Sequence, residues 1–390
     1  MDQTIRETIR TDLAHYTERI HLGAIIGKHA APFFVLDPLL IKKQYTALQV
    51  ALPGVQFYYA LKALNHPAVI KAIQDCAGYL DVATAGELAI VQAAGFPLDH
   101  CMQTHPIKKP AEIAGAYAAG IRRFVVENQA ELDKFTDAFT DAELLVRLRY
   151  TNPGAKSDLS YKFGASSIEA KQLVQRAHAA GRQVAGFCLH VGSQIDTAEA
   201  YRLAIGETIQ LMDELKQELG IRFSVLDIGG GFPVLYRDAV PTITEIARIV
   251  RPLIEPLQKE MTILAEPGRY IAAPAMLLVA SVAGKNTRFG KSWYYLDEGV
   301  YGAYSNIIFE QVQPQFFAYK ELATKRPLPL QSCVLAGPTC DSVDVLDTDY
   351  ALPGLDLGDL VISPTMGAYT TVSATTFNSI PKSAIVVVGS

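Results

Sequence analysis

Eight short apolar runs alternate with helical patterns between about residues 54 and 270, and this alternation constrains the fold more than any other feature. The runs are QFYYALK, YLDVA, CMQTH, FVVEN, LLVRLRY, GFCLHVG, SVLDIGGG and TILAEPGR. Amphipathic segments separate them, and several of these end in glycine, as helices often do. Strands that alternate with helices pair in parallel through right-handed crossovers. Eight strands close a barrel, so the sequence predicts an α/β fold with a TIM-like (β/α)8 barrel, and an open doubly wound sheet is the alternative.

The pattern changes after the eighth run. Segments such as AMLLVASVAGKN, WYYLDEGV, CVLAGP, DLVISP and AIVVVG are rich in strand-forming residues and are separated by Gly, Pro and Asn turns. They predict a C-terminal all-β domain, against which FFVLD at residues 33–37 is expected to pack. The expected divisions are an N-terminal segment (1–37), the barrel (38–274) and the β domain (275–390).

Composition excludes several classes of partner. The net charge of −5 gives no electrostatic basis for binding nucleic acid or an anionic membrane. The N-terminus is charged and amphipathic rather than signal-like, and no stretch reaches the roughly 20 apolar residues of a membrane span. The five cysteines are scattered without a CxxC pair, which argues against a disulfide framework or a zinc site and favours the cytoplasm. We therefore expect no metal.

Each apolar run ends in a polar residue or in glycine. In chain order these are Lys62, Asp81, His105, Glu127, Arg147, His190, Gly229–Gly231, and Glu266 with Arg269. Any one of them could simply be a solvated strand end. Barrel enzymes place their chemistry at the carboxyl ends of the strands, because the loops there surround one mouth. The set as a whole therefore predicts an active site.

Residue chemistry suggests roles for some of these positions. Lys62 follows apolar and aromatic residues, and partial desolvation would favour its neutral, nucleophilic amine. The three glycines would let backbone N–H groups approach an anion such as phosphate. Glu266 could keep a pyridine nitrogen protonated, and Arg269 could bind phosphate, although the two could also pair with each other.

Other candidates lie after the sixth run and in the β domain. His190 could stack on a planar cofactor while Ser193 reaches its phosphate. Cys340 and Asp341 lie in the polar turn GPTCDSVD, where the thiol could exchange protons and the carboxylate could bind an ammonium. Tyr369, in GAYTTVSATTFN, could bind phosphate through its hydroxyl. Each of these residues could also serve only the local turn.

Seven motifs together carry a resemblance to a known family. YALK, HVGSQ, DIGGGFP, AEPGRY, DEGVYG, GPTCDSVD and MGAYTTVSATTFN occur in the order found in fold-type III pyridoxal-phosphate decarboxylases. The chain is most similar to the eukaryotic-type ornithine decarboxylase branch, from about residue 30 onward. The resemblance implies a pyridoxal 5′-phosphate cofactor and decarboxylation of a basic amino acid to an amine.

The resemblance assigns roles residue by residue. It makes Lys62 the Schiff-base lysine, His190 the residue on the pyridine ring and Glu266 the partner of the ring nitrogen. The implied phosphate contacts are Ser193, Gly230, Gly231, Arg269 and Tyr369, and the residues that orient Lys62 are Asp81, Glu87 and Arg147. Cys340 is the implied proton donor to Cα, and the implied substrate contacts are Asp341, Glu310 and Tyr301. Because Cys340 and Asp341 come from the second subunit in this family, the resemblance also implies a homodimer.

The sequence departs from the ornithine pattern at one substrate position. Ornithine decarboxylases usually carry an Asp-His pair where this chain has Glu310 and Gln311, whereas Asp341 is the ornithine-type residue. We therefore expect ornithine as the first substrate, lysine next and arginine after them. HVGSQ is closer to the diaminopimelate enzymes, so diaminopimelate decarboxylase stays an alternative. A non-catalytic regulator of the same fold and an amino-acid racemase are the other two.

Overall fold

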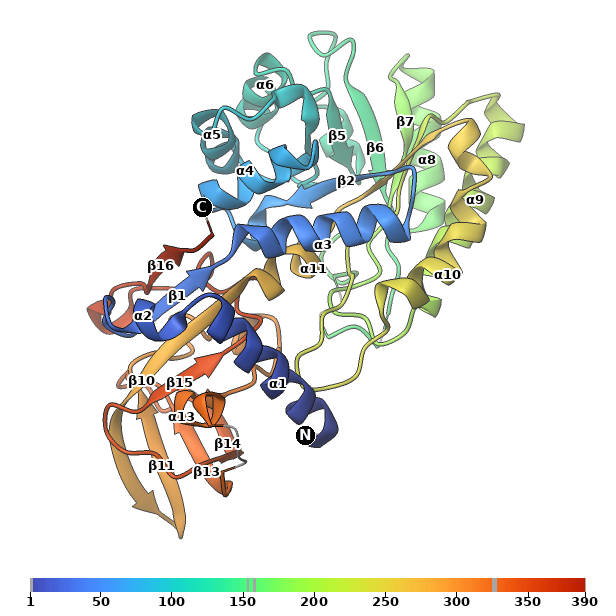
Figure 1. Cartoon of the computed structure of the whole chain (residues 1–390). Helices are drawn as coiled ribbons and strands as arrows, with labels where there is room; N and C mark the ends of the chain where they lie inside the picture. The colour runs from blue at the N-terminus through green and yellow to red at the C-terminus, as the bar shows by residue number, and fades with distance from the viewer. Residues whose placement is uncertain (1–2, 153, 157–158, 325–327, 390) are drawn as a thin grey trace. The chain divides into compact units, whose positions relative to one another are not determined.

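The chain divides into two compact units. The computed structural model describes residues 3–152, 154–156, 159–324 and 328–389 (Figure 1). The barrel unit comprises Lys42–Pro233 and Val240–Ile271. The β unit comprises Met1–Ile41, Val234–Ala239 and Ala272–Ser390. The divisions expected after residues 37 and 274 stay predictions.

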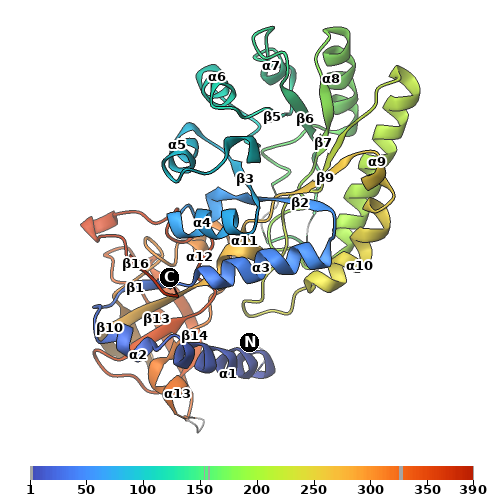
Figure 2. The ribbon, with the colours of Figure 1, turned by 45° about the horizontal axis from the view of Figure 1, so that its top comes forward.

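Eight parallel strands close the barrel in chain order from β2 to β9 (Figure 2). The strands are β2 (Val55–Ala60), β3 (Tyr79–Val82), β4 (Cys101–Gln103), β5 (Arg123–Val126), β6 (Glu143–Arg147), β7 (Val184–Cys188), β8 (Val225–Asp227) and β9 (Thr262–Ala265). The ring closes where β2 pairs with β9, with Val55 opposite Ile263. The prediction of a (β/α)8 barrel is confirmed, and the open sheet is wrong because β2 and β9 pair.

Helices precede, connect and follow the barrel strands (Figure 2). They are α3 (Pro38–Ala51), α4 (Pro67–Asp75), α5 (Ala85–Ala93), α6 (Pro110–Ala118), α7 (Gln129–Leu132), α8 (Ser167–Ala179), α9 (Glu199–Leu219), α10 (Ile243–Ile254) and α11 (Arg269–Ala272). The SSIE sequence forms a capping box at α8, in which Ser166 accepts from the backbone of Glu169. Gly220 ends α9 in the left-handed region at φ 66°.

Side chains fill the interior of the barrel. Seven of the eight strands contribute fully buried residues to one cluster, namely Tyr58, Met102, Val125, Leu145, Ala185, Cys188, Val225 and Leu264, and Tyr79 of β3 packs against it. This interior explains why the runs are apolar throughout rather than alternating, since parallel strands are covered on both faces. Charged side chains lie near the strand ends: Arg123 and Glu143 begin β5 and β6, whereas Asp81 and Arg147 lie near the carboxyl ends, where the candidate site lies.

A mixed sheet forms the β unit. Its central order is β12-β15-β10-β11-β13-β14, and β1 pairs with β10 and β16. The strands are β1 (Phe33–Leu36), β10 (Met276–Arg288), β11 (Lys291–Leu296), β12 (Phe317–Ala318), β13 (Gln331–Ala336), β14 (Val345–Leu352), β15 (Leu360–Ser363) and β16 (Ala384–Val387). The prediction of a separate β-rich domain is confirmed. Strands β12 and β14 were not expected from the sequence.

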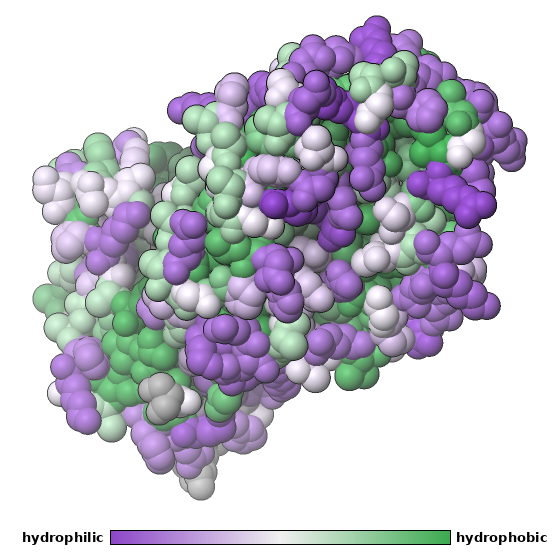
Figure 3. Space-filling model, turned by 90° about the horizontal axis from the view of Figure 1, so that it is seen from above, coloured by the Kyte–Doolittle hydropathy of each residue, from purple (hydrophilic) through white to green (hydrophobic). Residues whose placement is uncertain are grey.

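Helices of 4 to 17 residues accompany this sheet. They are α1 (Gln3–Arg19), α2 (Leu22–Ile26), α12 (Asn306–Phe309) and α13 (Tyr319–Ala323). A core that includes Leu13, Phe33, Leu277 and Ile362 joins α1 to the sheet. Across the described residues, no helix has the length and apolar character needed to cross a membrane. On the face shown in Figure 3, hydrophilic side chains surround small apolar patches.

Candidate active site

The carboxyl ends of the barrel strands bring the predicted residues to one end of the barrel. Arg147 is the last residue of β6, and Asp81 lies in β3, one residue before its end. Lys62 lies in the 3-10 turn Leu61–Ala63 directly after β2. The three glycines begin two residues after β8, and Glu266 follows β9 directly. The sequence prediction that these residues gather at one mouth therefore agrees with the strand ends.

Lys62 forms an ion pair with a buried carboxylate. Its Nζ lies 2.9 Å from Oδ2 of Asp81, whose side chain is only 1% exposed. The Lys62 side chain is 46% exposed, so it is less desolvated than its apolar neighbours in the sequence led us to expect. An opposite charge at this distance favours the ammonium form. The amine therefore has a fixed direction at the mouth of the barrel.

Two carboxyls lie at the ends of the neighbouring strands β8 and β9. Asp227 is fully buried, and its Oδ1 accepts from the backbone N–H of Gly229 at 2.8 Å. Burial raises the pKa of Glu266 well above its usual range, and the negative charge of Asp227 raises it further. Burial also raises the pKa of Asp227. Two carboxyls in this setting retain a proton at neutral pH more readily than either would alone. The sequence analysis missed Asp227, although it stands in the DIGGG motif.

His190 presents a neutral ring beside the glycines. Its Nδ1 accepts from the backbone N–H of Gly192 at 3.0 Å, which fixes the ring. Burial lowers the pKa of His190 to about 3, and the positive charges of Arg147 and Lys62 lower it further. A Cβ added to Gly230 would lie 3.2 Å from Nε2 of this ring. It would also lie only 2.7 Å from the backbone carbonyl oxygen of Glu266, so this carbonyl, with the His190 ring beside it, requires glycine at the second position of the motif.

The remaining groups at this end suit an anion. Arg269 is buried at the start of α11, and its Nη2 donates to Oγ of Ser193 at 3.1 Å. Gly231 has a φ of 105°, and a Cβ there would lie 2.4 Å from the carbonyl oxygen of Gly192. A guanidinium, a hydroxyl and side-chain-free backbone within one set of loops can hold a phosphate. These are the residues for which the resemblance implies that role.

Further polar residues support the mouth. Glu87 accepts from the backbone N–H of Ala83 at 2.7 Å, and burial raises the pKa of Glu87. Glu127 accepts from the N–H of Gly164 at 2.6 Å and so anchors the end of the β6–α8 loop. The guanidinium of Arg147 lies 5.3 Å from the ring centre of Phe163 in the same loop.

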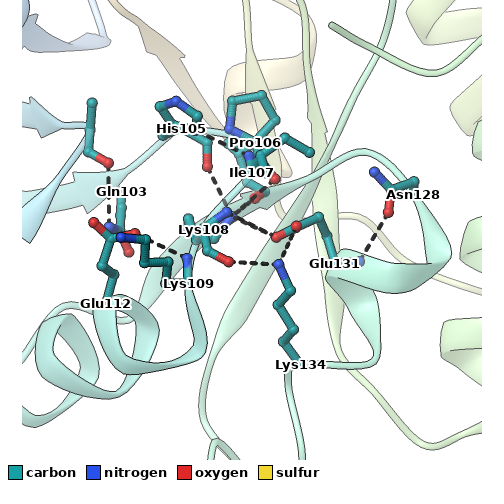
Figure 4. Close-up of polar contacts among 12 residues, drawn as sticks. Gln103, His105, Pro106, Ile107, Lys108, Lys109, Glu112, Asn128, Glu131 and Lys134 are labelled. Carbon is teal, nitrogen blue, oxygen red and sulfur yellow. Dashed lines mark hydrogen bonds and ion pairs between the residues drawn. The ribbon is translucent and has the colours of Figure 1, made fainter.

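A buried lysine holds the turn after β4 (Figure 4). Lys108 Nζ donates to the carbonyl oxygens of His105 at 2.9 Å and Val125 at 2.5 Å. Its backbone N–H donates to Glu131 at 3.2 Å, and Glu131 also pairs with Lys134. Burial lowers the pKa of Lys108 to about 8, although Glu131 opposes this change. The network fixes the turn between β4 and α6, a role that the sequence analysis did not anticipate.

In the β unit, the structure brings together Tyr301 and the turn of Cys340 and Asp341. The hydroxyl of Tyr301 donates to Oδ2 of Asp341 at 2.5 Å, and this bond lowers the pKa of the Asp341 carboxyl. The Tyr301 ring stacks on Phe377 at 4.3 Å between centroids. Cys340 is exposed, as the sequence predicted, and its N–H donates to Asn378 at 3.0 Å.

The other two β-unit candidates stand on separate segments. Glu310 ends the short helix α12, and its N–H donates to the carbonyl oxygen of Asn306 at 3.1 Å. Tyr369 lies between β15 and β16 in the left-handed region at φ 55°. Buried Asp344, which the sequence analysis missed, accepts from Val300 and Thr339 and so ties the Tyr301 and Cys340 segments together.

Comparisons with known proteins agree with this arrangement. Residues 39–273 match the family model "Pyridoxal-dependent decarboxylase, pyridoxal binding domain". A lysine/ornithine decarboxylase of Selenomonas ruminantium is 35% identical over 350 residues, which cover 89% of this chain and 87% of that protein. Antizyme inhibitor 2 of Xenopus laevis is 30% identical over 368 residues, covering 90% and 80%. The crystal structure of the Vibrio vulnificus lysine/ornithine decarboxylase with cadaverine superposes with a TM-score of 0.88 at 40% identity, covering 96% and 99%.

Proposed function

The chain belongs to the pyridoxal-dependent decarboxylases that act on basic amino acids, and we propose that ornithine and lysine are its substrates, ahead of arginine. It is a pyridoxal-phosphate enzyme that converts such an amino acid to the amine. Crystal structures of its V. vulnificus relative hold cadaverine in one case and putrescine in the other. These are the amines formed from lysine and ornithine, which supports both substrates.

The residues at the mouth of the barrel fit the cofactor. The supporting observation is one strand-end cluster that combines a paired amine, a neutral imidazole, a proton-retaining carboxyl and an anion cradle. We assign Lys62 to covalent attachment, with Asp81, Glu87 and Arg147 around it. We assign the phosphate to Ser193, Gly230, Gly231, Arg269 and Tyr369. Pyridoxal phosphate supplies the sink for the electron pair that remains when CO2 leaves.

Individual residues would then hold or move protons at stated atoms. Glu266 would share a proton with the ring nitrogen and so keep that nitrogen protonated; burial and Asp227 raise the pKa of Glu266 when no cationic partner is bound. His190 would lie against the face of the cofactor's pyridine ring as a neutral imidazole, because burial lowers the pKa of His190 to about 3. The Cys340 thiol would donate the proton that Cα needs, and its exposed position allows this role.

Substrate binding is assigned to the β unit. Asp341 is kept ionised by the hydroxyl of Tyr301, so it can pair with the distal ammonium of the substrate. The role assigned to Glu310 is to bind the same ammonium or to limit the length of the substrate pocket. It differs from the usual aspartate by one methylene, and it is the residue on which the choice between ornithine, lysine and arginine depends.

We also propose that the enzyme is a homodimer in which Cys340 and Asp341 serve the barrel of the partner. Apolar side chains on the segments that carry the substrate residues support this assembly: Ile308, Phe309, Val343 and Phe377 are 40–60% exposed. Exposed apolar groups of this size are typical of surfaces that another protein covers. A cytoplasmic location is proposed on the five free cysteines.

Borohydride reduction and product assays test the proposal together. Purified protein is expected to show the visible absorbance of bound pyridoxal phosphate. Borohydride reduction should leave the cofactor permanently attached, as a label, to the peptide that contains Lys62. Amine release is then measured from ornithine, lysine, arginine and diaminopimelate. Activity on diaminopimelate alone would overturn the substrate assignment, and a colourless, inactive protein would favour a regulator.

A further inference from the structure

Asp81 accepts from two side chains, one on each carboxylate oxygen. Oδ2 accepts from Lys62 at 2.9 Å, and Oδ1 accepts from the hydroxyl of Thr104 at 2.5 Å. Thr104 follows β4, the strand next to that of Asp81, and both side chains are buried. We propose that Thr104 is a positioning residue, which sets the plane of the Asp81 carboxylate and thereby the place of the Lys62 amine. The inference deepens the proposed function and rests on Lys62 as the attachment residue.

The covalent geometry of aspartate leaves this plane to be fixed by hydrogen bonds. The terminal torsion of an Asp side chain has broad minima, so sterics alone do not hold the carboxylate in one orientation. A threonine on a strand end is a suitable anchor, because its β-branched side chain has few rotamers. With Thr104 bound to Oδ1, Oδ2 must face Lys62. Without that donor the carboxylate can turn, and the bond to the amine is no longer directed.

The turn that carries Thr104 is itself held in place. Lys108, four residues further on, is buried and donates to the carbonyl oxygens of His105 and Val125 (Figure 4). Its network with Glu131 closes the other side of the turn. Thr104 therefore stands on a rigid segment, as a residue must if it is to orient another one.

Other charged groups also act on the Lys62 amine and must be separated from the effect of Thr104. The carboxyls of Glu87 and Glu266 and the imidazoles of His105 and His190 lie within electrostatic range of it. Burial lowers the pKa of both imidazoles and raises the pKa of both carboxyls. Exchanging the Thr104 hydroxyl for a methyl group alters none of these groups, so a change at Lys62 would report on the Asp81 bond.

The test measures the reactivity of Lys62 in the full-length chain after removal of pyridoxal phosphate. Trace acetylation at a series of pH values, with mass spectrometry of the Lys62 peptide, gives the pH at which half of this amine reacts. For Thr104→Val we expect this midpoint to fall by about one pH unit, because the ammonium loses its directed partner. Asp81→Asn should lower it at least as far, and Thr104→Ser, which keeps the hydroxyl, should restore the wild-type value.

Thr208→Val is the matched control, because it removes another buried threonine hydroxyl of the barrel unit. That hydroxyl donates to the carbonyl oxygen of Ala204 at 2.7 Å, within α9. The control should leave the Lys62 midpoint unchanged. An unchanged midpoint in Thr104→Val, or an equal shift in Thr208→Val, overturns the inference. If Thr104→Val does not fold, Thr104→Ala is read by the same criteria.

A separate readout distinguishes this failure from failure of the proposed function. Borohydride reduction of each holoenzyme shows where the cofactor is attached. Label on Lys62 with no midpoint shift in Thr104→Val rejects only the role of Thr104. Label on a different lysine rejects the assignment of Lys62, and the inference falls with it.

Discussion

At the scale of single residues, environment gives carboxyl groups of this chain opposite protonation behaviour. Burial and a second carboxyl raise the pKa of Glu266, so this group tends to hold a proton. A hydrogen bond from Tyr301 lowers the pKa of Asp341 on an exposed turn, so this group stays ionised. A buried carboxyl with a raised affinity for protons can share a proton with a ring nitrogen, whereas an ionised carboxylate can pair with an ammonium. The same functional group thus serves two purposes because its surroundings differ.

Removing the Tyr301 hydroxyl should weaken substrate binding more than turnover. In Tyr301→Phe, Asp341 loses the donor that orients it and lowers its pKa, so KM for ornithine and lysine should rise roughly five- to tenfold while kcat changes less. The rise should be larger toward acid pH, because the Asp341 pKa returns upward and its charge is lost at a higher pH. Steady-state kinetics across the acid range measure both effects. Tyr295→Phe, on β11 of the same unit, is the control. Equal falls in kcat for both variants would contradict the role of the Tyr301 hydroxyl in orienting Asp341.

Shortening Glu310 should change which substrate is preferred. Glu310→Asp withdraws the carboxylate by one methylene, so the ratio of kcat/KM for lysine to that for ornithine should rise by about tenfold. Glu310→Gln keeps the length and removes the charge, so it should reduce kcat/KM for both substrates by similar factors. Parallel assays measure kcat/KM for lysine and for ornithine in each variant. If this ratio is unchanged in Glu310→Asp, Glu310 does not determine the selectivity between lysine and ornithine.

Sequence reasoning identified residues whose chemistry is visible in a motif and missed those whose role is purely spatial. Lys62, His190 and Glu266 stand at strand ends and in recognisable motifs, so position and residue type were enough to propose roles for them. Thr104 was missed because a threonine at a strand end is common, and only the fold shows that its hydroxyl meets Asp81. The glycine motif was read as an anion cradle alone. The structure adds that Gly230 leaves room for the backbone carbonyl of Glu266 and for the His190 ring.

At the scale of elements, the turns after the strands are held by groups of their own. The β4–α6 turn is the clearest case, because a fully buried lysine donates to a carbonyl oxygen of the turn and to one of the neighbouring strand β5. The N-cap Asn128 accepts from the backbone of Glu131 and so places the carboxylate that completes the network (Figure 4). Such support allows a loop to hold catalytic groups as rigidly as a strand does.

Lys108 should make stability depend on pH in a predictable direction. Burial lowers the pKa of Lys108 to about 8 in the folded protein, below its ordinary value of 10.5. Between these pH values Lys108 therefore binds more protons in the unfolded chain than in the folded protein. As a result, the contribution of Lys108 to the free energy of unfolding increases by roughly 3 kcal/mol from pH 8 to pH 10.5. Lys108→Met should lack this increase, so its thermal midpoint should fall further below that of the wild type as pH rises.

Lys134→Met provides the control for this measurement, because Lys134 belongs to the same network but is 23% exposed. Its thermal midpoint should follow the pH dependence of the wild type. Parallel curves for wild type and Lys108→Met between pH 8 and pH 10.5 would show that Lys108 does not titrate in this range.

The barrel elements were predictable from sequence, while parts of the β sheet were not. The eight barrel strands are apolar because both of their faces are covered, and this leaves a continuous signal in the sequence. Strand β14 has the sequence VLDTDYAL, which contains two aspartates, a residue type that is depleted in strands. Its pairing with β13 overrides that local preference. Strand β12 has only two residues, too few to leave a pattern.

At the scale of the whole molecule, the two compact units carry different groups of the predicted site residues. The cofactor residues belong almost entirely to the barrel unit, whereas Tyr301, Glu310, Cys340 and Asp341 belong to the β unit. Composition and periodicity predict both units, because each has its own hydrophobic pattern. They carry no information about which copy of the chain completes a site. That assignment came from the resemblance to the family, and it needs a direct test.

Mixing two inactive variants can show whether a site uses two chains. Lys62→Ala and Cys340→Ala should each be nearly inactive as pure proteins. If Cys340 serves the partner barrel, a hybrid dimer has one site with both wild-type residues and one site that lacks both. Random exchange of subunits makes about half of the dimers hybrid, so activity should recover to about a quarter of wild type. If each site lies within one chain, no combination restores an intact site, and the mixture stays as inactive as its components. Mixing Lys62→Ala with Glu266→Ala, both changed in the barrel unit, should give no recovery in either case.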